Sequence, residues 1–98
     1  MRIVFANDHL ARICTNEAHK LGLPIAVITA ARLKLLKLEA AEDERTLRNW
    51  KGLYYKKLNG ERDGQRSVRI NVQYRIVFRL IQDQQPPTIM VLEIDDIH

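Results

Sequence analysis

The residues with the clearest chemical potential are two arginines and a histidine in the second half of the chain. Arg69 and Arg75 stand on either side of the short segment 70–74, and His98 is the last residue. A guanidinium group offers a planar fork of donors that matches phosphate oxygens, so two of them could hold one phosphodiester. An imidazole can donate or accept a proton near neutral pH. These residue types favour chemistry at a phosphate.

Both arginines lie in predicted strands, and the apolar alternation of those strands indicates which way they point. Val68 and Ile70 alternate with polar residues in the first strand, and Ile76 belongs to the apolar series of the second. Successive side chains of a strand point to opposite faces, so both apolar sets face the core only if residues of equal parity pair. The simplest such register sets Arg69 opposite Arg75 and Val68 opposite Ile76.

Like charges placed directly opposite each other destabilise a sheet, so this register calls for an anionic partner. A phosphate between the two guanidinium groups is one candidate. An internal ion pair with the last predicted strand is the other, and that strand offers Glu93, Asp95 and Asp96. The two interpretations can hold together, and both stay open at this point.

The positive charge is concentrated in one stretch of the chain. The formal net charge is +4, yet residues 45–79 contain ten basic and two acidic residues, and residues 80–98 contain four acidic residues and no lysine or arginine. A dense positive segment binds polyanions, because neutralising phosphates releases counterions. The pattern favours a nucleic-acid partner over the alternative of an ordinary solvated surface.

Two helices are predicted in the first half of the chain. Apolar residues recur at helical spacing from Leu10 to Leu21, after a capping residue at position 7 or 8, and Gly22 stands where a helix ends. A second apolar stripe covers residues 25–38, and Pro24 suits its first turn. The short connection predicts an antiparallel hairpin of helices.

After an acidic run at residues 42–44, which suits the start of a short helical turn, the apolar pattern changes to a period of two. Asn59-Gly60 and Asp63-Gly64 supply turn residues between strands. Strands are predicted at residues 3–5, 53–57, 67–71, 74–81 and 88–95. The elements predict an α+β fold, in which two N-terminal helices pack on a small twisted antiparallel sheet.

Size and composition describe one small globular unit. A chain of 98 residues with 46% hydrophobic and 29% charged residues can build one core, so residues 1–98 are expected to form a single domain. The longest apolar run, residues 23–31, is too short to cross a bilayer, and the first residues lack a secretory pattern. The single cysteine, Cys14, fits a reducing cytoplasm, and we expect it to be a small buried residue on the first helix.

The second half of the chain resembles a known toxin family. The resemblance is carried by LNG at residues 58–60, GQRSVRINVQYRIVF at 64–78 and EIDDIH at 93–98. These segments are similar to the pattern of the HigB branch of the RelE/ParE toxin superfamily. The helical half agrees with that family in length and order. Ile97 departs from the pattern, since many relatives carry a tyrosine there, and Asn59 stands where a lysine is common.

The resemblance implies a RelE-like fold and the toxin of a type II toxin–antitoxin system. The implied activity is that of a ribosome-dependent endoribonuclease, in which the ribose 2′-hydroxyl of mRNA attacks the adjacent phosphate. By the motif, Arg69 and Arg75 would hold the scissile phosphate where charge grows in the transition state. His98 would transfer protons, and Asp96 would orient it.

The implied partners are mRNA, the ribosome and a HigA-like helix-turn-helix antitoxin. Operator DNA would be bound only through the antitoxin. No cofactor, metal or membrane is implied. Contacts to the RNA backbone or bases are expected from Tyr55, Lys56, Lys57, Arg62, Arg66 and Arg79. Two alternatives remain: a ParE-like gyrase inhibitor without nuclease chemistry, and a non-catalytic nucleic-acid-binding relative.

Overall fold

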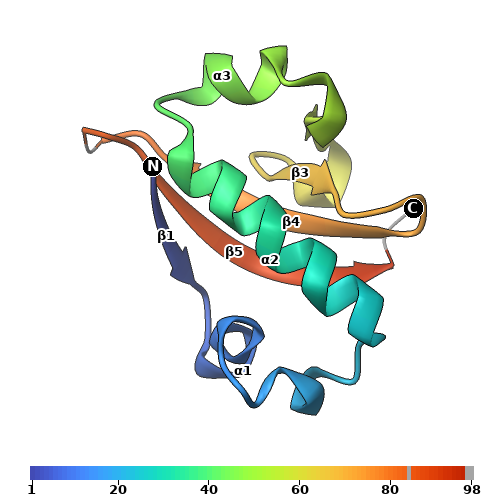
Figure 1. The fold of residues 1–98 in the computed structure, drawn as a ribbon. Coiled ribbons are helices and arrows are strands. Elements are labelled where there is room, and N and C mark those ends of the chain that lie inside the picture. Colours follow the sequence, from blue (N-terminus) through green and yellow to red (C-terminus); the bar gives the residue numbers. More distant parts are fainter. Residues whose placement is uncertain (84, 97–98) are drawn as a thin grey trace.

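The chain folds around a five-stranded sheet with the strand order β1-β5-β4-β3-β2 (Figure 1). The computed structural model describes residues 1–83 and 85–96. The strands are β1 Arg2–Phe5, β2 Lys56–Lys57, β3 Arg66–Arg69, β4 Tyr74–Ile81 and β5 Thr88–Asp96. Neighbouring strands are antiparallel except β1, which runs parallel to β5. The expected α+β class is confirmed, but the sheet is mixed, because no hairpin joins β1 to β5 and so none imposes antiparallel pairing.

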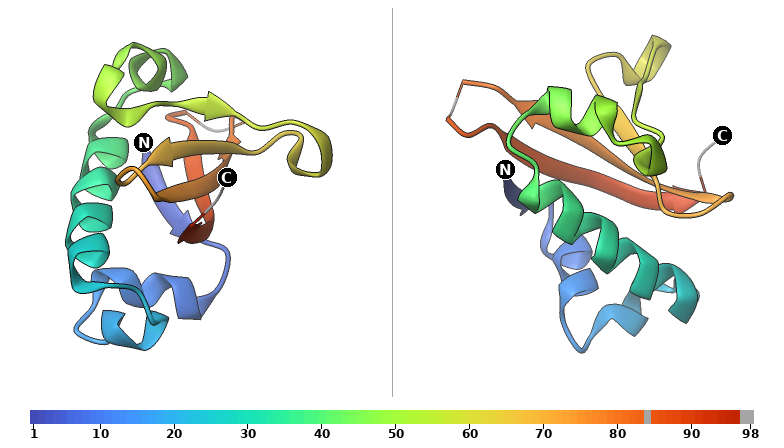
Figure 2. Two further views of the ribbon diagram at one scale, coloured as in Figure 1. Left: turned by 90° about the vertical axis from the view of Figure 1, so that its right-hand side faces the viewer. Right: turned by 45° about the horizontal axis from the view of Figure 1, so that its top comes forward.

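The α-helices of the described chain are α1 Asp8–Ala11, α2 Ile25–Ala40 and α3 Glu44–Asn49. α2 crosses one face of the sheet, with α3 and α1 near its two ends, and the opposite face carries no α-helix in the described ranges (Figure 2). None of these helices is long and apolar enough to cross a membrane. The helical layer of the described chain therefore lies on one face of the sheet.

The core lies between α2 and the helix-covered face of the sheet. α2 buries one stripe of apolar residues, which consists of Val27, Ile28, Ala31, Leu35 and Leu38. Ile76 and Phe78 of β4 and Ile89 and Val91 of β5 meet this stripe and are fully buried. Burial of aliphatic and aromatic side chains on this scale is the main stabilising contribution in a chain of this size. The helix itself starts at Ile25, one residue later than expected, with Pro24 as its N-cap.

The first predicted helix is broken, so the hairpin of two long helices is not formed. α1 spans one turn, and 3₁₀ turns follow at Arg12–Cys14 and Ala18–Leu21. Between them Thr15 has an extended backbone, and its hydroxyl donates to the Arg12 carbonyl and accepts from the Glu17 N–H. Arg32 of α2 then donates to the carbonyls of Ile13 and Thr15 at 2.6 and 2.7 Å. These bonds satisfy carbonyl groups that a continuous helix would pair internally.

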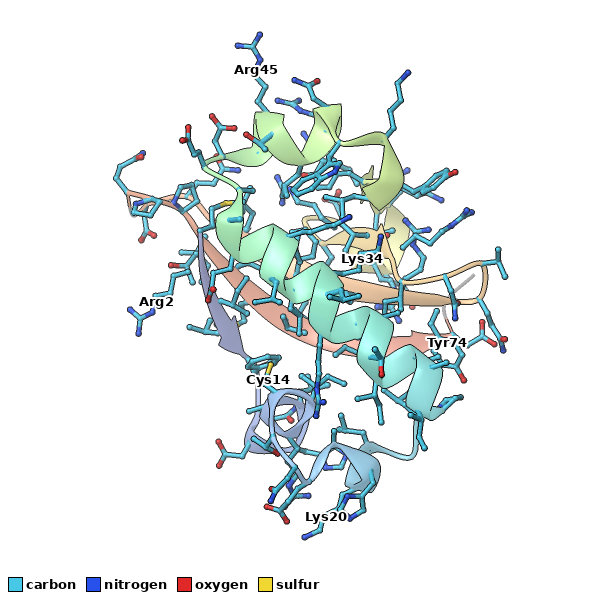
Figure 3. The ribbon with its side chains drawn as sticks, viewed as in Figure 1. Arg2, Cys14, Lys20, Lys34, Arg45 and Tyr74 are labelled. Carbon is cyan, nitrogen blue, oxygen red and sulfur yellow. The ribbon has the colours of Figure 1, made fainter. Side chains whose placement is uncertain are left out.

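The expectation that Cys14 is buried is wrong. Cys14 is exposed, and Figure 3 shows it beside the turns of the N-terminal segment. It ends a 3₁₀ turn, whose shorter period changes the direction in which each side chain points. Ile13, one residue earlier, takes the buried position with no exposed surface.

The strand predicted at residues 53–57 is shorter than expected. Lys51–Leu53 forms a 3₁₀ turn in which Leu53 is fully buried, and Tyr54 follows with a left-handed backbone. Strand pairing begins only at Lys56, which lies opposite Ser67. The anchoring of Leu53 in the core outweighs the strand propensity of the two tyrosines that follow it.

Leu38→Ala is expected to lower the free energy of unfolding by about 2–5 kcal/mol, because it removes buried methyl groups and leaves a cavity under the sheet. Leu38 has no exposed surface, whereas Leu36 on the same helix is 61% exposed. Leu36→Ala is the matched control and should change stability by less than about 0.5 kcal/mol. Urea unfolding followed by circular dichroism measures both. Equal effects of the two substitutions would contradict the described position of the core.

Candidate nucleic-acid interface

The sheet face opposite α2 is here called the arginine face and is defined by Ser67, Arg69, Arg75, Val77 and Glu93. These residues alternate along β3, β4 and β5 with the buried apolar residues that pack under α2. Their side chains therefore point away from α2, as period-two alternation requires, and of these residues Ser67 and Val77 have no exposed surface. The left view of Figure 2 shows the sheet from its edge, with α2 on one side of it and the arginine face turned to the other.

The predicted register between β3 and β4 is confirmed. Arg69 pairs with Arg75, and Val68 pairs with Ile76. Asp95 of β5 continues the row on the other side of Arg75. Two guanidinium groups thus stand on adjacent strands of one face, as the burial of Val68 and Ile76 demands.

Arg75 is held by two hydrogen bonds that fix its guanidinium group. Its Nε donates to the Ser67 hydroxyl at 2.9 Å, and its Nη2 donates to the Tyr54 carbonyl at 2.7 Å. Partial burial and then the positive charge of Arg69 lower the pKa of Arg75 below its ordinary value. A lowered pKa means that the local surroundings disfavour the positive charge, and a bound anion would relieve this.

Arg69 is positioned by an aromatic ring. Its guanidinium carbon lies 4.0 Å from the centroid of the Tyr54 ring, which is a cation–π contact. Tyr54 therefore contacts both arginines, one through its ring and the other through its carbonyl. Tyr54 was not among the expected site residues. Strand alternation could not have indicated it, because Tyr54 precedes β2 and has a left-handed backbone.

The acidic residues of β5 bind other partners. Glu93 forms a salt bridge with Arg62 at 3.0 Å, and Asp96 accepts a hydrogen bond from the Gln73 amide at 2.9 Å. Asp95 accepts from the backbone N–H of Asp96. Within residues 1–83 and 85–96, no salt bridge joins Arg69 or Arg75 to a carboxylate. The internal ion pair considered as an alternative is therefore not formed in this part of the chain.

Three further basic residues expected to contact RNA share the arginine face. Lys56 is exposed and lies opposite Ser67. Arg62 reaches across the face to Glu93, and Arg79 is exposed two positions beyond Val77 on the same side of β4. Five cations thus gather on this surface: Lys56, Arg62, Arg69, Arg75 and Arg79.

The other expected RNA contacts lie on the opposite side of β2 and β3. Arg66 and Lys57 pair across these strands, and both approach the Glu44 carboxylate of α3, at 3.0 and 4.0 Å. Tyr55 donates to the same carboxylate, accepts from Arg66 Nε at 2.8 Å, and packs against Phe78. We call Glu44, Tyr55 and Arg66 the α3 clamp, because their contacts tie α3 to the sheet edge.

Two of the four residues expected to act in catalysis are brought together, namely Arg69 and Arg75. Asp96 ends β5 opposite Tyr74, the first residue of β4. The predicted proton-transfer residue His98 and the departure at Ile97 lie outside the described residues. In the described ranges, no cluster of three or more histidine, cysteine, aspartate or glutamate side chains could hold a metal ion.

The fold is similar to the solved structure of the YoeB/ParE toxin from Agrobacterium tumefaciens, with a TM-score of 0.56, 14% sequence identity and coverage of 100% of both chains. Comparison with curated proteins gave no significant match.

The family model for the RelE-like toxin of type II toxin–antitoxin system HigB matches residues 3–91. The chain therefore belongs to the HigB-like toxin family. It is a toxin of a type II toxin–antitoxin system, in which the toxin pairs with an antitoxin. The resemblance seen in the sequence motifs is confirmed.

Glu44→Gln is expected to lower the free energy of unfolding by about 1–3 kcal/mol near neutral pH, because the α3 clamp loses its charged acceptor. Burial opposes ionisation of Glu44, but hydrogen bonds from Tyr55 and Arg66 outweigh it, so the pKa of Glu44 lies below its ordinary value of 4.5. A carboxyl group whose pKa is lower in the folded state than in the unfolded state stabilises the fold fully at pH values above its unfolded-state pKa. This contribution is lost as the pH falls through the folded-state pKa.

The stability difference between wild type and Glu44→Gln should therefore shrink as the pH is lowered below 4.5. Urea unfolding at a series of pH values measures it. Glu42→Gln is the control, since Glu42 is an exposed neighbour outside the clamp. A difference that grows in acid would contradict the charged acceptor role of Glu44.

Proposed function

We propose that this toxin is a ribosome-dependent endoribonuclease that cleaves mRNA, with the arginine face as its active surface. The observation that carries the proposal is the cross-strand pair Arg69–Arg75, which points away from the core and forms no salt bridge with a described carboxylate. An RNA phosphate between the two guanidinium groups would supply the negative charge that this pair lacks.

In the proposed reaction the ribose 2′-hydroxyl attacks the adjacent phosphorus and the bond to the 5′-oxygen of the next nucleotide breaks. Negative charge grows on the phosphate oxygens during this step. Arg69 and Arg75 would stabilise it, and the bonds from Arg75 to Ser67 and Tyr54 would hold one guanidinium in place before substrate arrives. Such fixed donors stabilise the transition state without having to reorganise.

Proton transfer is assigned to the last residues of the chain. We propose that His98 moves the proton of the 2′-hydroxyl or of the leaving oxygen, and that Asp96 orients it. The support for these roles is the closing motif at residues 93–98, together with the position of Asp96 at the end of β5, opposite the start of β4. Arg75 is the next residue of β4 after Tyr74, so it lies near the same end of the sheet as Asp96.

The remaining cations of the arginine face would bind the RNA backbone. Lys56 and Arg79 are exposed, and Arg62 would exchange its contact with Glu93 for a phosphate. The contacts of Tyr55, Lys57 and Arg66 with Glu44 favour a supporting role, and direct RNA contact by these three stays a prediction. Binding through so many cations should weaken steeply as salt is raised.

Arg75→Ala is expected to reduce mRNA cleavage by about 100-fold or more, since it removes a fixed donor from the developing charge. The measurement is expression of wild type and variant in cells, followed by mapping of mRNA 5′ ends. Cuts should fall at fixed positions within codons, because the ribosome sets the reading frame. His98→Ala should remove the same cuts.

Arg45→Ala is the matched control, because Arg45 is an exposed arginine on α3 whose side chain points away from the molecule (Figure 3). The Arg45→Ala variant should cleave mRNA as wild type does. Intact mRNA in cells whose growth is arrested would reject the nuclease proposal. DNA breaks trapped with gyrase in those cells would favour the ParE-like alternative instead.

The antitoxin is proposed to be a HigA-like helix-turn-helix protein that covers or distorts the arginine face, and operator DNA would be bound only through it. A reading frame for such a protein beside this gene should encode a partner that co-purifies with the toxin. Its co-expression should abolish the mRNA cuts and restore growth. Co-purification of the pair while cleavage continues unchanged would show that the antitoxin leaves the arginine face accessible.

A further inference from the structure

Tyr54 combines an exposed ring with an unusual backbone conformation. Its φ and ψ are +50° and +49°, in the left-handed region that a bulky residue adopts only at an energetic cost. Burial does not account for that cost, because Tyr54 is 56% exposed. Its neighbour Tyr55 behaves in the opposite way, since it is half-buried, packs against Phe78 and donates to Glu44.

The exposed ring is nevertheless held in position. Leu53 before it is fully buried, and Tyr55 after it belongs to the α3 clamp. The Tyr54 carbonyl accepts from Arg75 at 2.7 Å, and the guanidinium of Arg69 lies 4.0 Å from the ring centroid. The ring is therefore presented beside the arginine pair with little freedom to move, and ordering it on binding would cost little entropy.

We propose that Tyr54 is the base-stacking residue of the arginine face: a nucleobase adjacent to the phosphate held by Arg69 and Arg75 stacks on the exposed surface of its ring. The inference rests on the proposed function, since it names the RNA contact of the same site. Unstacked bases of single-stranded RNA bind aromatic side chains in this way. The guanidinium of Arg69 on the ring adds a cation–π contact to the stack.

This arrangement indicates the class of ligand. The two guanidinium groups recognise one phosphate, and the ring recognises the flat surface of a base, so the site fits a nucleotide unit of single-stranded RNA. Every base has such a surface, and stacking therefore discriminates weakly among bases. The Tyr54 hydroxyl plays no part in the proposed contact, which makes phenylalanine an adequate replacement and leucine an inadequate one.

The first test measures binding of a fluorescent single-stranded RNA oligonucleotide whose 2′-hydroxyls are all methylated, so that it cannot be cleaved. Tyr54→Leu should weaken binding by about tenfold or more, whereas Tyr54→Phe should bind within about twofold of wild type. Thermal unfolding of each variant shows whether it is folded. Arg45→Ala, on exposed α3, is the control for a general loss of surface charge or contact.

A set of oligonucleotides that each lack one base then separates stacking from a structural effect. At the nucleotide whose base stacks on Tyr54, removal of that base should weaken RNA binding by wild type about as much as the substitution Tyr54→Leu does. Removal of the same base should not weaken RNA binding by the Tyr54→Leu variant any further, because that variant has already lost the stacking contact. Equal penalties in wild type and Tyr54→Leu at every position would overturn the proposal. So would equal binding by wild type and Tyr54→Leu, or no binding by wild type.

Cleavage on translating ribosomes distinguishes the failure of this inference from that of the proposed function. If wild type cuts mRNA but the base-deletion series shows no coupling to Tyr54, the nuclease proposal stands and the stacking role falls. If the coupling is present but wild type leaves mRNA intact, the RNA-binding role of Tyr54 stands and the nuclease proposal falls.

Discussion

The pairing of β3 with β4 in a single register is the constraint on which the rest of the arginine face depends. Val68 and Ile76 are both fully buried under α2, and their burial selects the pairing that sets Arg69 beside Arg75. A shift by one residue would turn the guanidinium groups into the core and the apolar residues toward water. A small domain is too marginally stable to tolerate such an exchange. Hydrophobic packing on one face therefore forces two like charges together on the other.

Two adjacent tyrosines connect the scaffold with this face. Tyr55 points to the helix side, where it joins Glu44 and Arg66 in the α3 clamp. Tyr54 points the other way and supplies a ring to Arg69 and a carbonyl to Arg75. Because the two residues are consecutive, the clamp that anchors one also places the other. The arginine pair is thus positioned from the rigid part of the fold, which suits the proposed stabilisation of a transition state by fixed donors.

The sequence predicted those elements whose apolar pattern is long and regular. α2 and β4 lie where their periodicity indicated, and the facing of Arg69 and Arg75 follows from parity alone. The first helix was expected to be continuous because Leu10 and Leu21 keep a helical spacing, yet the chain breaks at Thr15. The Thr15 hydroxyl contributes locally through its bonds with Arg12 and Glu17. The tertiary contribution is Arg32 of α2, which binds the carbonyls at the break and is not encoded within the segment itself.

For the site, the sequence by itself determined the features on which the proposed chemistry rests: a positive segment, two arginines on one face of a sheet and a family motif that ends in His98. The facing of the two arginines could be predicted because the alternation of apolar and polar residues is a local property of each strand. Only the tertiary structure decided which neighbours complete the pair, since the left-handed backbone of Tyr54 and the salt bridge from Glu93 to Arg62 depend on segments far apart in the chain. Tyr54 rather than Tyr55 stands beside the arginines because the buried Leu53 and the α3 clamp, not strand propensity, set the direction of the chain there.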